Sequence, residues 1–263
     1  MEPGFFTANR PRVVLQKHTH PLPMPPNPPR VSDLRLLNNK ALIRDDESDP
    51  GGRIYRDDQG EVYHSVTRIL KETSASKHIL EAWVKRLGEE LAGQERDQAA
   101  ERGTRTHNAA EYVLKTAKKL SERAARSRGV WLPRDDGLYR VPAPLTQWAI
   151  RKTIPSAPKV GISAQGYKRS LLSWIGENVT CIHAIEFGIN HPLGFAGTCD
   201  ALIDVNGVLT VSDWKTSFRK RSPDMLKDYR DQLGAYSLGL KHILGLEVQQ
   251  GAVVVSRRVG SAQ

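Results

Sequence analysis

The chain has 263 residues, of which 39% are hydrophobic and 26% charged, a composition that suits one sizeable soluble globular domain. Its formal net charge of +10 favours a polyanionic partner, although charge alone leaves a solvated basic surface as an equal alternative. The two cysteines, Cys181 and Cys199, exclude a four-cysteine metal site within one chain and a disulfide framework, and no apolar run is long enough to span a membrane.

The first 60 residues lack the periodicity of packed elements. Residues 18–30 are rich in proline, which cannot join helix or sheet ladders, so we expect an extended arm there. The polar, Gly-containing residues 44–60 indicate a loop or hairpin. We therefore expect the folded domain to occupy residues 61–263, after a largely extended arm and loop over residues 1–60.

Helical patterns follow this segment. Residues 61–70 predict a short strand that leads into a helix capped by Ser65 or Thr67. Further helices are expected from about residue 76 to 87 and from about residue 98 to 118. The second places His107 and Glu111 four residues apart, on one helical face.

A basic region occupies residues 112–170. It contains 13 Lys and Arg against three Asp and Glu, so it carries the whole formal excess of the chain. The charge is therefore localised, which favours a binding surface over general solubility. Interleaved aromatic residues could stack on unpaired bases, although each one taken singly is more often a core residue.

From about residue 179 the pattern changes to strands. Four are expected, over residues 181–189, 195–205, 208–216 and 251–258. A helix should precede the last strand, with Ser222 as its N-cap and Pro223 in the first helical position. Its apolar residues recur at spacings of three and four and form one stripe, made of Leu226, Tyr229, Leu233, Tyr236, Leu240 and Ile243.

The strongest local signal is Asn206-Gly207, which predicts a two-residue hairpin turn between two β-rich runs. That turn fixes the strand register so that Asp200 lies directly opposite Asp213, with Cβ atoms about 5 Å apart. Lys215 lies two residues beyond Asp213 and therefore points to the same face. Two carboxylates and an ammonium group are thus expected to converge.

Two carboxylates at that distance repel each other unless a cation lies between them. A hard divalent ion such as Mg²⁺ or Mn²⁺ would relieve the repulsion, and Lys215 would add a fixed positive charge or a proton relay to an attacking water. Phosphodiester hydrolysis needs these groups. The alternative is an Asp–Lys–Asp cluster on a solvated hairpin face, but apolar residues on both faces of the hairpin favour a partly buried, metal-binding pair.

Three ordered motifs, GTCD at 197–200, DWK at 213–215 and QLGAY at 232–236, resemble the PD-(D/E)XK nuclease superfamily in its RecB-like branch. The resemblance is strongest to the mitochondrial genome maintenance exonuclease family and its bacterial and phage relatives, and extends over about residues 61–256. It implies an α/β fold with a central mixed β-sheet flanked by helices, a restriction-endonuclease-like core. CRISPR-adaptation relatives carry a four-cysteine cluster that this chain lacks, so no iron–sulfur cluster is expected.

The resemblance also implies roles for individual residues. The catalytic residues would be Asp200, Asp213 and Lys215. The metal ligands would be His107, Asp200, Asp213 and the carbonyl of Trp214. Glu111 could orient His107 or hold a water beyond the ligands, and Glu186 would be a further acid beyond them. The DNA-binding residues would be Ser65, Thr67, Arg105, Gln232 and Tyr236. Without the resemblance, His107 would be a structural histidine and Tyr236 a packing residue.

The expected function is Mg²⁺- or Mn²⁺-dependent exonucleolytic hydrolysis of DNA, single-stranded or in flaps, during replication, repair or recombination. We expect no membrane partner, and a cytoplasmic location in a bacterial or phage-infected cell, with an organelle left open.

The basic region should form a wall or lid of the DNA groove. Two alternatives stay open: an inactive DNA-binding recombination accessory protein, and a structure-specific endonuclease that acts on DNA or RNA. Relatives usually add a helix after the strand at 251–258, and the sequence leaves open whether the C-terminus is shortened.

Overall fold

The computed structural model describes residues 42–74, 77–133 and 139–263, so the expected proline-rich arm lies outside the described residues. The strands are β1 (Ile43–Asp45), β2 (Ile54–Arg56), β3 (Val62–Ser65), β4 (Leu132–Pro133), β5 (Tyr139–Arg140), β6 (Val179–His191), β7 (Phe195–Val205), β8 (Val208–Ser217) and β9 (Gln250–Arg257). The α-helices are α1 (Val66–Thr73), α2 (Lys77–Leu87), α3 (Glu89–Arg128), α4 (Ala143–Thr153), α5 (Ile162–Asn178) and α6 (Lys227–Leu244). Two 3-10 turns are η2 (Ile154–Ser156) and η3 (Asp224–Leu226).

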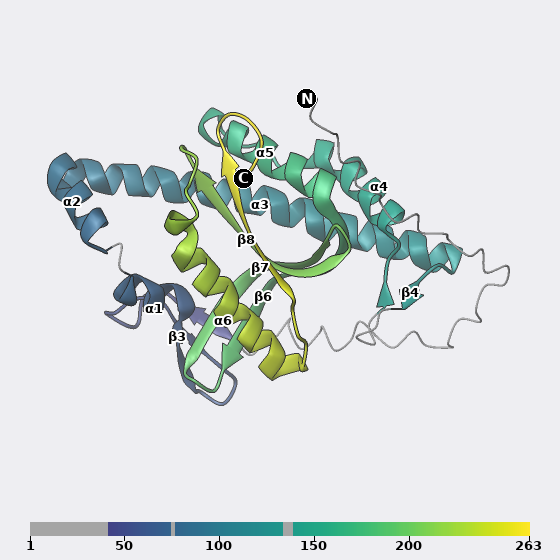
Figure 1. Ribbon diagram of the computed structural model, residues 1–263, viewed down its shortest axis with the longest axis horizontal. Coiled ribbons are helices and arrows are strands. Elements are labelled where there is room, and N and C mark those ends of the chain that lie inside the picture. The colour runs from purple at the N-terminus through teal and green to yellow at the C-terminus, as the bar shows by residue number, and fades with distance from the viewer. Residues whose placement is uncertain (1–41, 75–76, 134–138) are drawn as a thin grey trace, which may run out of the picture.

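A mixed sheet of seven strands forms the centre of the fold, with β7 as its most connected strand. β6 pairs antiparallel with one edge of β7, and β8 pairs antiparallel with the other. β3 and β9 add parallel pairings to β7 and β8. Helices α3, α4 and α5 lie on one side of the sheet and α6 on the other (Figure 1). The expected α/β architecture with a central mixed sheet is confirmed.

One edge of β7 is shared by two strands. β3 pairs with it at Phe195 and Ala196, and β8 pairs with it from Ala201 to Val205. Between these stretches, residues 197–199 pair with β6, and within the described chain residues 197–200 pair with neither β3 nor β8. β8 continues beyond this point as the partner of β9. The sheet therefore opens beside the GTCD segment, and this opening positions the site described below.

The β7–β8 hairpin has the predicted register. Val205 pairs with Val208, and both turn residues, Asn206 and Gly207, have the positive φ of a type I′ turn (51° and 88°). The paired residues end at Ala201 and Ser212, so Asp200 and Asp213 are the next positions along the hairpin. Both faces of the hairpin are buried, as expected for a central position in the sheet.

The long helix α3 passes across one face of the sheet. Small residues recur along its buried stripe, including Ala109, Ala110 and Ala117, and allow the helix to pack closely against the strands. Its forty residues run well past both ends predicted for this helix. The first part was missed because residues 89–98 are almost all polar, so they show no apolar periodicity, although most are strong helix formers. Gly129, with φ 64°, ends the helix in the left-handed conformation.

Two buried clusters hold the layers together. One lies between α3, α4, α5 and the sheet and includes Trp214, which makes an edge contact with Trp174 at 5.9 Å between ring centroids. The other lies between the sheet and α1 and α6, and includes Leu202, Val211 and Leu240. Alternate residues of β7 and β8 therefore supply both cores.

The start of α6 differs from the prediction. The helix begins at Lys227, not after Ser222, because Pro223 leads into the separate turn η3 and no side chain caps α6. The predicted apolar stripe is nevertheless oriented toward the sheet, with Leu233, Tyr236 and Leu240 buried. Helices α4 and α5, within the basic region, were not predicted.

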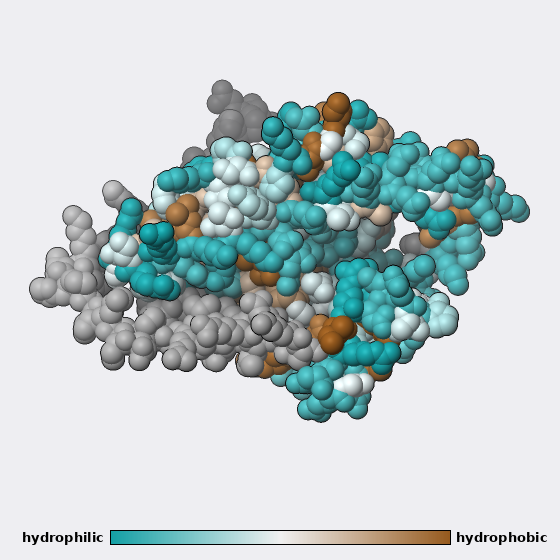
Figure 2. Space-filling view, turned by 180° about the vertical axis from the view of Figure 1, so that it is seen from behind, coloured by the Kyte–Doolittle hydropathy of each residue, from teal (hydrophilic) through white to brown (hydrophobic). Residues whose placement is uncertain are grey.

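The face seen from behind is mostly hydrophilic, with scattered hydrophobic side chains (Figure 2). Among the described residues, no helix is both long enough and apolar enough to cross a bilayer. The hydrophobic residues are thus concentrated at the sheet–helix interfaces.

We predict that Leu202→Ala lowers the free energy of unfolding by about 2–5 kcal/mol, because Leu202 is fully buried between the sheet and α6. Leu238→Ala is the matched control, since Leu238 on α6 is half-exposed and its loss should change stability by about 0.5 kcal/mol or less. Urea denaturation followed by circular dichroism measures both. Equal effects of the two substitutions would contradict this packing.

Candidate active site

A polar cavity of about 190 Å³ lies at the opening beside β7. Its walls come from the N-terminal strands, the start of α1, the middle of α3, strands β6 to β8 and α6. The lining residues are Arg44, Arg53, Tyr55, Ser65, Val66, Thr67, His107, Glu186, Gly197, Thr198, Asp200, Asp213, Lys215, Gln232 and Tyr236. Residues from nine helices and strands therefore converge on one small space.

Asp200 bridges the two strands where they separate. Its Oδ2 accepts a hydrogen bond from the backbone N–H of Trp214 at 2.6 Å, and the residue is only 8% exposed. Burial raises the pKa of Asp200 well above its usual range, and the nearby charges of Asp213 and Glu186 raise it further. The single backbone hydrogen bond opposes this shift but does not overcome it.

Asp213 is held by two neighbours. Lys215 Nζ lies 2.6 Å from its Oδ2, and Gln232 Nε2 donates to its Oδ1 at 2.9 Å. Gln232 also donates to the hydroxyl of Tyr236 at 2.8 Å. The Tyr236 ring packs over Gly197, where a Cβ would lie 2.6 Å from the ring, so this position of the GTCD segment requires glycine. Gln232 and Tyr236 therefore fix the carboxylate of Asp213 from α6.

Lys215 is an ammonium group at neutral pH. Burial by itself lowers the pKa of Lys215, but the ion pair with Asp213 and the charge of Asp200 outweigh burial and raise it. The Nζ atom also lies 5.0 Å from the centre of the Tyr229 ring, in a cation–π contact. A permanent positive charge is thus held within reach of the carboxylates.

Glu186 lines the cavity from β6, where its backbone departs from the extended strand conformation. It has a positive φ of 50°, and the flanking pairs of β6 and β7 place it opposite Asp200. Burial, followed by the charges of Glu111 and Asp213, raises the pKa of Glu186 to about 7. Strained backbone and a perturbed carboxyl group at one position are typical of functional residues.

His107 completes the cluster from the middle of α3. One ligand atom from each of His107, Glu186 and Asp200 lies within 4.8 Å of the others. Burial, with the charge of Lys215, lowers the pKa of His107, so its imidazole is neutral at pH 7 and keeps a lone pair. The ring is also hydrogen-bonded to the backbone of Trp214, which places that peptide group beside the cluster.

The remaining expected site residues differ in their positions. Ser65 and Thr67 line the cavity at the start of α1, where Ser65 Oγ caps the helix by accepting from Arg68 N–H. Glu111 pairs with Lys115, one turn along α3, and reaches the site only through its charge on Glu186. Arg105 pairs with Glu101 on the outer face of α3 and is not among the lining residues.

Sequence patterns missed several lining residues on the N-terminal strands. Arg44 and Arg53 come from residues expected to form a loop or hairpin, and Tyr55 donates to or accepts from Thr198 Oγ1 at 3.2 Å. Arg44 lies on β1, Tyr55 lies on β2, and Arg53 directly precedes β2. Each of these strands has too few residues for a period-two pattern to stand out. The charge of Arg44 favours the ionised form of Glu186 and so opposes the rise in its pKa.

A second group of ligand-type side chains lies in the core near the hairpin turn. Cys181, His183 and Asp204 are buried together, and His183 Nε2 lies 2.8 Å from Asp204 Oδ1. Burial lowers the pKa of His183, but Cys181 and Asp204 together raise it to about 9. Arg140 lies 3.8 Å from the other oxygen of Asp204, so this carboxylate lies between two basic side chains.

The raised pKa of Glu186 predicts a stability difference in metal-free protein. The folded state binds this proton more tightly than the unfolded state does, so ionisation of Glu186 costs stability progressively from about pH 4.5 to about pH 7 and fully above that. Glu186→Gln should therefore raise the free energy of unfolding by on the order of 1–3 kcal/mol at pH 8 and leave it unchanged near pH 4.5. Denaturation in EDTA at both pH values tests this, and a variant less stable at pH 8 would contradict it.

Comparisons with known proteins identify the family of this chain. The sequence is 26% identical over 237 residues to Mitochondrial genome maintenance exonuclease 1 of Homo sapiens, an alignment that includes 86% of this chain and 58% of that protein. The profile of the PD-(D/E)XK nuclease superfamily matches residues 44–260, which include every residue of the cavity. The family expected from the three ordered motifs is confirmed, and the chain belongs to the PD-(D/E)XK nuclease superfamily.

Proposed function

We propose that the protein is a Mg²⁺- or Mn²⁺-dependent exonuclease that hydrolyses single-stranded DNA or flaps during replication, repair or recombination. The observation that carries the proposal is the meeting of three carboxyl groups, those of Glu186, Asp200 and Asp213, in one small cavity. Membership of a nuclease superfamily and the name of the human relative support the reaction class.

The acidic cluster fits a divalent cation. Burial and mutual repulsion raise the pKa values of Glu186 and Asp200, so both residues would gain from a positive charge between them. Carboxylate oxygens with one neutral imidazole suit Mg²⁺ or Mn²⁺, and nucleases of this superfamily generally depend on divalent metals. The residues that would hold the ion are His107, Glu186, Asp200, Asp213 and the Trp214 carbonyl. When bound, such an ion lowers the pKa of water and neutralises phosphate charge.

Lys215 supplies the permanent charge that hydrolysis of a phosphodiester requires. Because its raised pKa keeps it protonated, it is suited to hold a phosphate oxygen and to stabilise charge that builds up in the transition state. Its ion pair with Asp213 fixes the position of Nζ before substrate arrives. A protonated lysine cannot accept a proton, so we assign it an electrostatic role.

Two further sets of residues position the reacting groups. Gln232 and Tyr236 hold Asp213 so that its carboxylate cannot rotate away when Lys215 engages a phosphate. Ser65 and Thr67 line the cavity opposite α6, where their hydroxyl groups can donate to phosphate oxygens. The cavity thus combines acidic ligands for a divalent cation with hydrogen-bond donors for a phosphate group.

We predict that Lys215→Ala and Asp213→Asn each lower DNA hydrolysis by about 10²-fold or more, because the first removes the positive charge at the reacting phosphate and the second removes a negative charge that would hold the divalent cation. DNA binding should largely persist. Lys227→Ala is the matched control, since Lys227 is exposed and pairs only with Asp231. Cleavage of end-labelled single-stranded DNA in Mg²⁺ or Mn²⁺ measures the effect, and EDTA should abolish it. Equal turnover by wild type and both variants would refute the assignment.

The mode of cleavage separates the alternatives. We expect linear single-stranded DNA to be degraded and circular single-stranded DNA of the same sequence to resist, because an exonuclease needs an end. Cleavage of the circle would indicate an endonuclease, and cleavage of a matched RNA would extend the substrate class. Salt-sensitive binding with no metal-dependent products would indicate an inactive accessory protein.

A further inference from the structure

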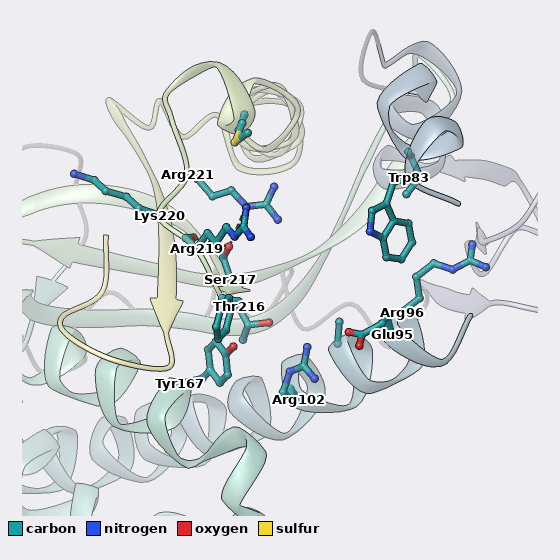
Figure 3. A pocket seen from close by; sticks show the side chains of 14 residues that line it. Trp83, Glu95, Arg96, Arg102, Tyr167, Thr216, Ser217, Arg219, Lys220 and Arg221 are labelled. Atoms are coloured by element: carbon teal, nitrogen blue, oxygen red, sulfur yellow. Dashed lines mark hydrogen bonds between the residues drawn. The ribbon is translucent and has the colours of Figure 1, made fainter. Parts of the chain in front are cut away.

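A second and larger cleft, of about 540 Å³, opens beside the catalytic residues. Helices α2 and α3 form one side, and the end of β8 with the segment that follows it forms the other (Figure 3). Thr216, which lines the cleft, directly follows Lys215 in the chain. The cleft therefore adjoins the proposed active site at the C-terminal end of β8.

The cleft is strongly basic. Its lining includes Arg96, Arg102, Arg219, Lys220 and Arg221 against one acid, Glu95. Within the described chain, none of the four arginines forms an ion pair; Arg96 donates to a carbonyl of α3 and Arg221 to Ser217 Oγ. Uncompensated arginines that face one hollow favour a polyanion, and phosphates spaced along a strand match several separate guanidinium groups.

Aromatic side chains accompany these arginines. Trp83 projects from α2 into the hollow, and Arg219 and Arg221 extend toward it from the opposite side, whereas Lys220 points away (Figure 3). Phe218 also lines the cleft and is 70% exposed, an unusual exposure for a large apolar ring. Trp83 is half-buried and Phe218 is exposed, and basic residues combined with such rings suit binding of unpaired bases, because a ring can stack only on a base whose face is free.

Helix α3 gives the distance between this cleft and the active site. Arg102 and Arg96 precede His107 by five and eleven residues on the same continuous helix, which corresponds to about 7 Å and about 16 Å along its axis. A stacked strand advances about 3.4 Å per nucleotide, so the arginines are reached about two to five nucleotides from the cleavage point. Arg96, Ala99 and Arg102 are spaced by three residues, so each lies about 60° around the helix from the next, and all three line the cleft.

We propose that this cleft binds the unpaired strand about two to five nucleotides away from the scissile phosphate, with phosphates on Arg102, Arg219 and Arg221 and a base stacked on Trp83. The inference rests on the proposed function, because it takes a DNA strand as substrate. It adds that the substrate must extend into the cleft on one side of the cleaved bond. Very short strands cannot do so, and are therefore cut slowly.

Binding tests the cleft independently of hydrolysis. In EDTA, with Lys215→Ala protein and a fluorescent 12-nucleotide single strand, Trp83→Ala should weaken binding by about 5- to 150-fold. Arg219→Ala combined with Arg221→Ala should also weaken it, and should reduce the slope of log K against log salt by about 1.4. Lys241→Ala, on α6, is the matched control and should bind as the parent does, because Lys241 pairs with Glu247 and does not line the cleft. Thermal unfolding shows whether each variant is folded.

Hydrolysis tests the length requirement. Wild-type protein should cleave a 12-nucleotide strand with a higher kcat/KM than a three-nucleotide strand, and Trp83→Ala should reduce that ratio. Three results would overturn the inference. The folded cleft variants could bind the single strand as well as the parent does, or they could lose binding to a 12-base-pair duplex as much as to the single strand. The third is a ratio of kcat/KM values for the 12- and three-nucleotide strands that Trp83→Ala leaves unchanged. If wild type cleaves no DNA with either metal, the proposed function fails, whereas loss of single-strand binding in the cleft variants would still support the binding site.

Discussion

Electrostatic repulsion within a buried space is the constraint on which the site depends. Glu186, Asp200 and Asp213 come from three neighbouring strands and meet where few water molecules can separate their charges. The protein offsets part of this repulsion with Lys215 and with the backbone N–H of Trp214. The remainder shows as raised pKa values for Glu186 and Asp200, which is why we propose a cation for this cavity.

The fold creates this space by dividing one edge of β7 between two partners. β3 pairs with the first two residues of β7 and β8 pairs with the last five. The GTCD segment between them is therefore unpaired on this edge and open toward α6 and α3. The two helices then fill the opening from opposite faces of the sheet, one with His107 and the other with Gln232 and Tyr236. A sheet with uninterrupted pairing at this position would bury the same backbone groups and leave no cavity.

The sequence predicted those parts of the site that depend on local rules. A two-residue turn fixes a register, so Asp200, Asp213 and Lys215 could be placed together from spacing alone. The position of Glu186 depends on a positive φ within a strand, which no periodicity indicates. The basic cleft is assembled from α2, α3, β8 and the segment after it, and of the basic region at 112–170 only Tyr167 is among its lining residues. The expected role of the basic region as a wall or lid of a DNA groove stays a prediction, and the cleft adds a second basic surface.

Helix α3 has a consequence for the geometry of the whole protein. The same unbroken ladder of backbone hydrogen bonds carries Arg96, Arg102 and His107, so these side chains cannot slide or turn relative to one another without bending the helix. Deleting one residue between Arg102 and His107 would shift the arginines by about 1.5 Å and swing them by about 100° around the axis. The helix thus fixes the axial distance between Arg96, Arg102 and His107, the residues to which we assign strand binding and metal binding.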